Sequence, residues 1–378
     1  MIASVHSIGC EQRHLDARRV QAWLTANGAT LVDDPGAADV VVIVTCAVDT
    51  RNEEASTAAL RRLGQLKRAS AKLVVGGCLP SISPHRLAVA PVAFTFSPRS
   101  LERLEELWGP LLQVPLARIP DHNTPSLEDM PTRVPLLGTP REIYDRAKCG
   151  FTIRLNHGCL LGCSYCVIRL ATGRLKSVPG ELIEAQFQEA IRRAEPTVML
   201  VGGDTGAYGR DLGNNLPQLL QALLARGGEQ RLFVHDLNAN WFVKDLQSYA
   251  TLFRGDCAQL QALCIPVQSG SDRILRLMRR PYKTADVIRA LGLTRALAPH
   301  ILLGTHLIAG FPGETKEDFA QTLALVREFP FDFVTCFRYS EHPSASAAKI
   351  RPKIGEDEKL ARLELLRTTL GSAATILT

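Results

Sequence analysis

Three cysteines lie close together in the segment GCLLGCSYCVIR, residues 158–169: Cys159, Cys163 and Cys166. Their spacing, Cys-x3-Cys-x2-Cys, follows a run that is typical of a buried strand, FTIRLN at 151–156. A structural zinc site needs four ligands, usually in two separated pairs, so three thiols in one loop suit zinc poorly. Three thiolates do suit a four-iron cluster, and they leave one iron open to a further ligand. We therefore predict that this triplet binds an iron–sulfur cluster.

A second set of cysteines is spread along the first 80 residues. Cys10 follows IASVHSIG, Cys46 follows VVVIVT and Cys78 follows KLVVGG, so each of three predicted strands ends in a thiol. The carboxyl ends of parallel strands share one edge of a sheet, so cysteines 36 and 32 residues apart can meet there. One buried cysteine is usually a small hydrophobic residue, but three in the same position predict a second thiol site.

The other four cysteines have no spacing that is typical of metal ligands: Cys149, Cys257, Cys264 and Cys336. Two of them, Cys264 and Cys336, fall within predicted strands, and we expect them to be core residues.

Composition limits the class of protein. The 378 residues are too many for one ordinary core, and a hydrophobic content of 46% indicates a globular chain. No run of about 18 apolar residues predicts a membrane span, and the start MIASVHSIGCEQR lacks the features of a signal peptide. We therefore expect a cytoplasmic protein, in which ten cysteines stay reduced and serve metal binding or catalysis rather than disulfides. The net charge of +6 permits an anionic partner such as RNA but does not require one.

The first part of the chain alternates between strand and helix patterns. We predict a helix near 11–27 and a second from a capping box at Thr50 to Glu53 as far as Lys67. The predicted strands lie between these helices and reach to VAFTF at 92–96. This pattern predicts a doubly wound domain with a parallel sheet at 1–109.

A different pattern follows. Residues 110–140 contain seven prolines without a period, so we predict an extended linker at 110–147. Six β/α units then predict a partial (β/α)6 barrel of the TIM type at 148–350, with its ligand site at the carboxyl ends of the strands. A helix is expected within 351–378. The predicted barrel strands are 151–156, 197–202, 231–238, 262–268, 301–310 and 331–340.

The triplet resembles the hallmark of the radical S-adenosylmethionine (radical SAM) superfamily, in which the open iron binds SAM. The resemblance implies that SAM is split to give a 5′-deoxyadenosyl radical. It also implies that Gly202, Gly203 and Asp204 lie near the SAM amino group. On sequence alone, VGGDTG at 201–206 is a turn, and only its place after the second barrel strand favours this role. Further cofactor contacts are expected from Gln268, Ile308 and Gly310, the last two in LIAGFPGE at 307–314.

The segments SIGCEQ, VTCAVDT and GGCLPS are similar to the amino-terminal domain of the methylthiotransferases, a radical SAM family. The resemblance continues through TGRLKSVP, PVQSGSDRILRLMRRPY and FRYSEHPSASAAK, and so covers nearly the whole chain. It implies two [4Fe-4S] clusters, the second held by Cys10, Cys46 and Cys78. The first cluster generates the radical that takes hydrogen from an unactivated carbon, and the second supplies sulfur. In the family, a second SAM methylates that sulfur.

Cofactors must carry this chemistry, so no catalytic triad is expected. Candidates for lining the cavity are 172–174, Gln268, Ser269 and Arg338, and each could equally be a solvated or capping residue.

The chain also departs from the family pattern. Only 28 residues follow Ile350, so we predict that the RNA-binding TRAM domain of the tRNA-modifying members is absent. Near the second set of cysteines, Arg13, His14 and Arg18 replace the asparagine and acidic residues usual in the family, and Val44 replaces another asparagine.

These departures favour a small molecule, nucleoside or peptide as the substrate over an adenosine beside the tRNA anticodon. Both remain open, as does sulfur insertion without methylation. A non-catalytic iron–sulfur electron-transfer protein is the alternative from another class, and the SAM-like motifs weigh against it. Other expected partners are SAM and a reductant such as flavodoxin or ferredoxin, with no membrane and a monomeric state.

Overall fold

The computed structural model describes residues 1–109, 112–123, 139–148 and 150–377. The chain forms two compact units, each with its own hydrophobic core. The first unit comprises Met1–Asn123 with Cys166–Arg174, and the second comprises Thr124–Tyr165 with Leu175–Thr378.

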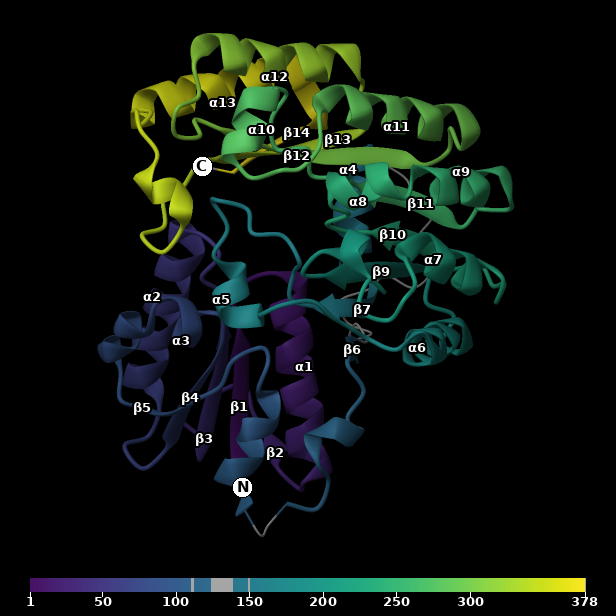
Figure 1. Ribbon diagram of the computed structural model, residues 1–378. Coiled ribbons are helices and arrows are strands. Elements are labelled where there is room, and N and C mark those ends of the chain that lie inside the picture. Colours follow the sequence, from purple (N-terminus) through teal and green to yellow (C-terminus); the bar gives the residue numbers. More distant parts are fainter. Residues whose placement is uncertain (110–111, 124–138, 149, 378) are drawn as a thin grey trace. The chain divides into compact units, whose positions relative to one another are not determined.

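The first unit is built on a five-stranded sheet in the order β2-β1-β3-β4-β5 (Figure 1). All of its strand pairs are parallel. The order reverses between β1 and β3, and such a switch point is where open α/β sheets bind ligands, at the carboxyl ends of the strands. The strands are β1 (Ile2–Ser7), β2 (Thr30–Leu31), β3 (Val40–Thr45), β4 (Lys72–Gly77) and β5 (Val92–Thr95).

Helices cover both faces of this sheet, which confirms the predicted doubly wound fold. Val20, Trp23 and Leu24 of α1 pack on one face, and Leu60 and Leu63 of α2 pack on the other. The central strand β3 is buried along its whole length, as its unbroken run of β-branched residues predicts. The helices and short remaining elements of this unit are α1 (Glu11–Ala26), α2 (Thr50–Leu66), α3 (Leu79–Ile82), α5 (Ile168–Thr172), η1 (Pro84–Val89), η2 (Leu101–Leu107), η4 (Leu116–Arg118) and β6 (His122–Asn123).

Helix α2 begins one residue earlier than the predicted capping box. Asp49 is its N-cap, and the Asp49 carboxylate accepts a hydrogen bond of 2.7 Å from the backbone N–H of Asn52. The predicted capping box from Thr50 to Glu53 is therefore wrong. An aspartate in extended backbone satisfies the free N–H groups of the first turn at least as well as a threonine does.

The second unit is built on a sheet whose main strands run in the order β13-β12-β11-β10-β9-β7, all parallel. These six strands correspond to the six predicted barrel strands, which confirms the predicted fold class. The bounds in this unit are β7 (Phe151–His157), β8 (Lys176–Ser177), β9 (Thr197–Gly202), β10 (Arg231–Val234), β11 (Leu260–Cys264), β12 (Leu302–Ala309), β13 (Phe333–Arg338) and β14 (Ala374–Leu377).

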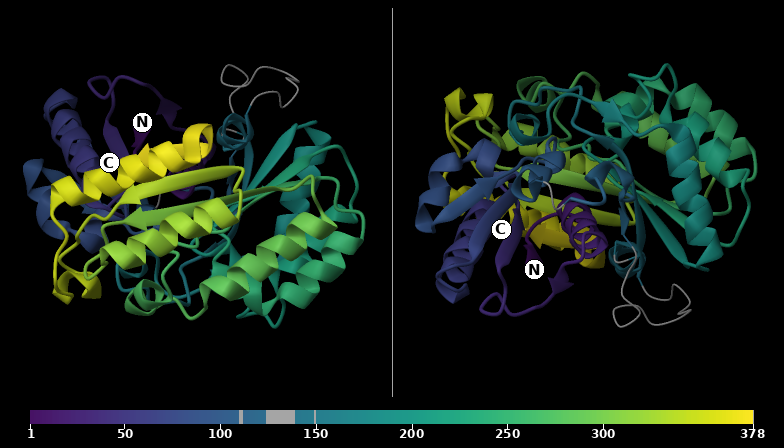
Figure 2. Two further views of the ribbon diagram at one scale, coloured as in Figure 1. Left: turned by 90° about the horizontal axis from the view of Figure 1, so that it is seen from above. Right: turned by 90° about the horizontal axis from the view of Figure 1, so that it is seen from below.

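Helices form an outer layer on one face of this sheet (Figure 2). Alternate strand residues such as Ile153, Leu200 and Leu303 face these helices in one continuous core, so the intervening residues face the other side. Among the described residues, no helix is long and apolar enough to cross a membrane. The helices are α4 (Pro140–Ala147), α6 (Gly180–Arg192), α7 (Leu216–Leu224), α8 (Ala239–Lys244), α9 (Leu246–Arg254), α10 (Asp272–Leu277), α11 (Thr284–Leu297), α12 (Lys316–Glu328), α13 (Glu356–Leu370), η5 (Thr205–Ala207), η6 (Ser346–Lys349) and η7 (Gly371–Ala373).

Two segments contain more structure than their sequences indicate. Within the predicted linker, α4 begins at Pro140, where Thr139 and Glu142 exchange side-chain to backbone hydrogen bonds of 2.8 and 3.3 Å. Parts of that linker, 110–111 and 124–138, lie outside the described residues. At the carboxyl end, α13 is followed by strand β14, which pairs in parallel with β13. The prediction of a helix alone at 351–378 missed this strand, because a strand of four residues is too short to show a recognisable alternation of apolar and polar side chains.

Gly304 in β12 has no room for a side chain, because a Cβ there would collide with the ring of Phe333 in β13. We predict that Gly304→Ala lowers the free energy of unfolding by about 1–3 kcal/mol, the usual effect of overpacking a core. Urea unfolding followed by circular dichroism measures this change. Gly292→Ala in α11 is the matched control, since its Cβ would meet nothing within 4 Å. The control should raise stability by up to about 1 kcal/mol through helix propensity, and equal effects of the two variants would contradict the prediction.

Candidate functional site

Cys10, Cys46 and Cys78 all lie at the carboxyl edge of the first sheet. Cys10 is the N-cap of α1, just beyond β1, while Cys46 and Cys78 directly follow β3 and β4. These three strands are neighbours in the sheet, and the N–H of Cys78 donates to the carbonyl of Thr45 at 2.8 Å. Gly9 approaches Cys46 so closely that a Cβ at Gly9 would lie 2.5 Å from the Cβ of Cys46. The topology therefore brings the three segments that carry these cysteines together, as their positions in sequence predict.

The three thiols also influence one another electrostatically. Burial, the largest cause, and the charge of the neighbouring thiolates together raise the pKa of Cys10 to about 11 and that of Cys46 to about 12. The pKa of Cys78 is raised as well, first by burial. Without a metal these groups are protonated thiols at neutral pH. Binding a metal as thiolates must therefore release protons.

A buried ion pair lies against these thiols. Nη2 of Arg13 is 3.1 Å from Oδ2 of Asp16, and both side chains are almost fully buried, with 2% and 0% exposed. Nη1 of the same guanidinium donates to Sγ of Cys78 at 3.6 Å. A positive charge therefore lies where thiolate ligands would concentrate negative charge.

No group of three or more His, Cys, Asp or Glu side chains in the described parts of the chain is arranged to hold a single metal ion. This is consistent with a cluster, because each thiolate of a four-iron cluster binds its own iron and the sulfurs need not converge on one point. Three thiols at one sheet edge, those of Cys46 and Cys78 buried and that of Cys10 exposed, lie beside a guanidinium and form a donor set that fits a [4Fe-4S] cluster.

The triplet of Cys159, Cys163 and Cys166 lies in the segment that follows β7. The S–H of Cys159 points to Oδ2 of Asp204 at 3.7 Å, and Sγ of Cys159 accepts from the N–H of Leu161 at 3.3 Å. Nη1 of Arg280 donates to Sγ of Cys163 at 3.8 Å. Cys159, Cys163 and Cys166 are each half-buried.

Gly202, Gly203 and Asp204 form the turn at the end of β9. The N–H of Gly203 donates to Oδ1 of Asn156 at 3.0 Å, and a Cβ on Gly203 would strike the carbonyl of Gly158. The absence of a side chain at Gly203 thus lets this turn pack against the start of the cysteine loop. The spacing predicted these positions, and the structure shows why glycine is needed at this one.

Asp204 is buried at this turn. Burial raises its pKa to about 6, while the indole N–H of Trp241, at 3.0 Å, and the charge of Arg280 act in the opposite direction. Its Oδ1 atom is buried and has no hydrogen-bond partner among the described residues. A buried acceptor without a partner is uncommon in native proteins, and a bound donor would account for it.

The other predicted cofactor contacts follow β11 or lie at the end of β12. Gln268 has a left-handed backbone (φ +75°), its N–H donates to the carbonyl of His306 at 2.8 Å, and its Oε1 is buried without a partner among the described residues. Ile308 is 9% exposed, and Gly310 (φ +76°) lies so close to Lys359 that a Cβ would collide with it.

These residues fit SAM in charge and in hydrogen bonding. The unpartnered oxygens of Asp204 and Gln268 are acceptors, whereas the amino group and ribose of SAM carry donors. Because the sheet order is β12-β11-β10-β9, the two acceptors and Gly310 lie along one edge of one sheet.

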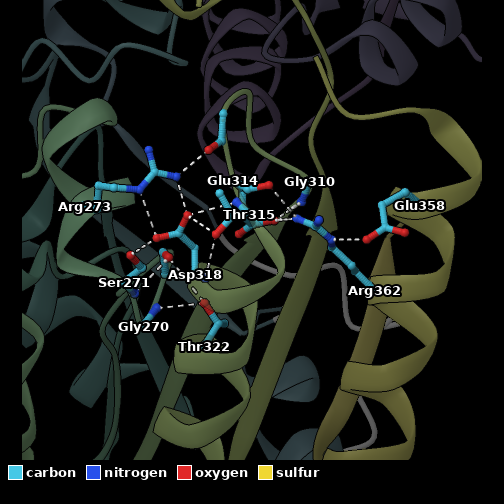
Figure 3. Close-up of polar contacts among 12 residues, drawn as sticks. Gly270, Ser271, Arg273, Gly310, Glu314, Thr315, Asp318, Thr322, Glu358 and Arg362 are labelled. Atoms are coloured by element: carbon cyan, nitrogen blue, oxygen red, sulfur yellow. Dashed lines mark hydrogen bonds and ion pairs between the residues drawn. The ribbon is translucent and has the colours of Figure 1, made fainter. Parts of the chain in front are cut away.

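A polar network, buried except at Arg273, supports the loops that carry Gln268 and Gly310 (Figure 3). Arg273 pairs with Asp318, which also accepts from Ser271 Oγ at 2.6 Å. On the other side, the Glu314 carboxylate accepts from the N–H of Gly310 at 2.8 Å and from Nη1 of Arg362 at 2.5 Å. The Glu314 side chain is fully buried and that of Arg362 is 5% exposed. The network ties both loops to α12 and α13.

The remaining cavity candidates have structural contacts. Ser269 is buried against Thr322, Arg338 pairs with Glu356 at 3.3 Å, and Thr172 bonds to the backbone of its own helix, at Ile168. Cys257, Cys264 and Cys336 are buried, and Cys149 lies outside the described residues.

Sequence reasoning missed a cluster around Asp236, which follows β10. His235 Nε2 is 3.3 Å and His306 Nδ1 is 3.7 Å from its two carboxylate oxygens. The hydroxyl of Tyr144 hydrogen-bonds with Nδ1 of His235. Burial lowers the pKa of His306 to about 4, so this imidazole is neutral at pH 7. The cluster presents a carboxylate acceptor, 39% exposed, beside the turn of Asp204. The sequence signal that could have revealed this cluster is the pair His235-Asp236 near the end of the predicted strand at 231–238.

Comparison with known families covers both units. Residues 3–96 match the family described as uncharacterized protein family UPF0004, and residues 153–326 match the radical SAM superfamily.

Relatives match over most of the chain. A protein of Pyrococcus horikoshii named probable threonylcarbamoyladenosine tRNA methylthiotransferase is 32% identical over 91% of this chain and 78% of its own length. A threonylcarbamoyladenosine tRNA methylthiotransferase of Thermotoga maritima is 29% identical over 96% of this chain and 80% of its own. A tRNA-2-methylthio-N(6)-dimethylallyladenosine synthase of Thermotoga petrophila matches equally well, with the same identity and coverage.

Solved structures share the fold. The radical SAM methyltransferase TsrM of Kitasatospora setae has a TM-score of 0.60 at 14% identity, over 89% of this chain and 74% of that one. The cobalamin-dependent radical SAM enzyme OxsB has a TM-score of 0.57 at 14% identity, over 86% of this chain and 52% of its own.

The Glu314–Arg362 pair should be essential for stability. Arg362→Met leaves a buried carboxylate without its cation, and breaking such a pair costs about 3–5 kcal/mol. Urea unfolding measures the loss. Arg367→Met on the same helix is the control: Arg367 pairs with Glu364 at the surface, where screening by water leaves little to lose. Similar losses for the two variants would contradict the importance of burial.

Proposed function

Since the chain belongs to the radical SAM methylthiotransferase family, we propose that it attaches a methylthio group to an N6-modified adenosine of tRNA, with threonylcarbamoyladenosine as the first candidate. The enzyme uses SAM and [4Fe-4S] clusters, as the family does. Electron donor, oligomeric state and cellular location stay predictions.

The observation that carries this proposal is the extent of the match to tRNA methylthiotransferases. It spans 91–96% of the chain, and the two family matches, residues 3–96 and 153–326, include both sets of cysteines. A lone iron–sulfur electron-transfer domain would explain the thiols but not the glycine turn and acceptors at the strand ends of the second unit.

The proposed ligands of the cluster that activates SAM are Cys159, Cys163 and Cys166, on the basis of their spacing. Those of the second cluster are Cys10, Cys46 and Cys78, on the basis of three neighbouring strand ends. When bound, these groups supply a 5′-deoxyadenosyl radical and a sulfur atom.

The protein's own side chains would bind and orient SAM. Asp204 and Gln268 would accept hydrogen bonds from SAM, and their unpartnered buried oxygens support this role. Gly203 and Gly310 allow backbone to approach closely, and Ile308 offers an apolar edge for adenine. The polar network of Figure 3 holds two of these loops in place.

The relatives favour tRNA over the small molecule, nucleoside or peptide that the sequence favoured. Their names specify tRNA adenosines with either a threonylcarbamoyl or a dimethylallyl group. The sequence departures near Arg13 do not outweigh a match of this length.

Reaction with defined RNA tests the proposal. The anaerobically reconstituted chain is given SAM, dithionite and a tRNA that carries threonylcarbamoyladenosine, and nucleosides are identified by mass spectrometry after digestion. We expect 5′-deoxyadenosine and the methylthio nucleoside. The dimethylallyl tRNA distinguishes the second candidate. SAM cleavage without thiolation of either RNA would overturn the proposal that tRNA is the substrate. Absence of 5′-deoxyadenosine would overturn the proposal that the chain is a radical SAM enzyme.

Replacing each set of cysteines tests the ligand assignment. The intact chain should hold about eight irons, and either triple alanine variant about four. Loss of Cys159, Cys163 and Cys166 should abolish SAM cleavage. Loss of Cys10, Cys46 and Cys78 should spare SAM cleavage and stop sulfur transfer. Cys257→Ala is the control, and thiolated product from the second triple variant would show that the second set is not the source of sulfur.

A further inference from the structure

Arg13 is the one described cation whose side chain bonds to a cysteine of the second set. Its guanidinium is 3.6 Å from Sγ of Cys78 through Nη1 and 3.1 Å from Asp16 through Nη2. Its Nε is buried and has no hydrogen-bond partner within the described part of the chain.

The position of Arg13 follows from the local fold. It lies in the first turn of α1, and its backbone N–H donates to the carbonyl of Cys10 at 2.8 Å. A Cβ at Gly9 would lie 3.4 Å from Cγ of Arg13, so the loop after β1 and this side chain are packed together. The backbone thus positions the start of the Arg13 side chain, and Asp16 pairs with its guanidinium.

The guanidinium carries a charge despite its burial. Burial disfavours the charged form, but Asp16 and the thiols of Cys78, Cys10 and Cys46 raise the pKa of Arg13 above its ordinary value. Asp16 compensates the charge at Nη2, while Nη1 donates to Cys78. An arginine therefore stays a cation at any pH at which the protein is folded.

Charge and hydrogen bonds to sulfur set the potential of an iron–sulfur cluster. An N–H donor to a ligand sulfur and a nearby positive charge both stabilise the reduced state, which carries one more electron. A carboxylate nearby has the opposite effect, so Arg13 and Asp16 act with opposite signs.

We propose that Arg13 is a positioning residue that raises the one-electron reduction potential of the cluster held by Cys10, Cys46 and Cys78, and that Asp16 limits this effect. The inference rests on the proposed function. In that reaction, a carbon radical would form a bond to a sulfur atom whose bond to the open iron breaks, and the one electron left over would pass to the cluster. A higher reduction potential of the cluster would favour this step.

The test isolates the second cluster. In the full-length chain with Cys159, Cys163 and Cys166 replaced by alanine, the midpoint potential is measured by electron paramagnetic resonance during titration with dithionite and mediators. Arg13→Gln should lower the potential enough to change the ratio of oxidised to reduced cluster at least tenfold, about 59 mV for one electron. Asp16→Asn should raise the potential, since it removes the opposing charge and leaves Arg13 in place.

Arg18→Gln is the matched control, an exposed arginine on the same helix, and should leave the potential unchanged. If the role were purely structural, Arg13→Gln and Asp16→Asn would shift the midpoint potential in the same direction, and that result would overturn the proposal. An unchanged midpoint potential in Arg13→Gln would overturn it as well. If Arg13→Gln loses its iron, the direction in which Asp16→Asn shifts the midpoint potential decides the question: an increase supports the proposal and a decrease overturns it. Absence of any cluster in the parent variant would overturn the ligand assignment together with this role, whereas an intact cluster with unmoved potentials overturns the role of Arg13 alone.

Discussion

Parallel strands expose their carboxyl ends at one edge, and this constraint determines where chemistry can occur in both units. In the first unit, three cysteines follow three neighbouring strands. In the second, a cysteine loop, a glycine turn, a carboxylate and an amide follow β7, β9, β10 and β11 in turn. Residues far apart in sequence become neighbours because every strand ends on the same side, and the helices that return the chain occupy the faces of the sheet.

Glycine lets these strand ends approach one another. Gly9 leaves room for Cys46 and Gly203 for the backbone of Gly158, and in each case a Cβ would lie too close. Polar contacts then fix the loops that glycine leaves free to bend. The pair of Glu314 and Arg362 and the contacts of Asp318 do this in the second unit (Figure 3), whereas Arg13 and Asp16 lie beside the cysteines of the first.

Much of this could be read from the sequence, because period and position are local signals. Runs such as VVVIVT predicted central strands, and a cysteine after each of three strands predicted a shared edge. The N-cap at Asp49, the start of α4 at Pro140 and the short strand β14 could not be predicted, since each depends on one side chain or on pairing with a distant strand. The contact of Asp236 with His306 was missed for the same reason: it joins residues 70 positions apart, across β11.

The two proposed cluster sites differ in how much of the chain must fold before they exist. One set of cysteines lies within eight residues of a single loop, whereas the other joins positions 10, 46 and 78 and exists only once β1, β3 and β4 are paired. Closing such long connections is slow compared with ordering one loop. Metal binding adds its free energy to whatever fold creates the site. Loading of the second site would therefore report that the amino-terminal sheet is complete, and iron delivered during synthesis would reach the two sites at different stages of folding.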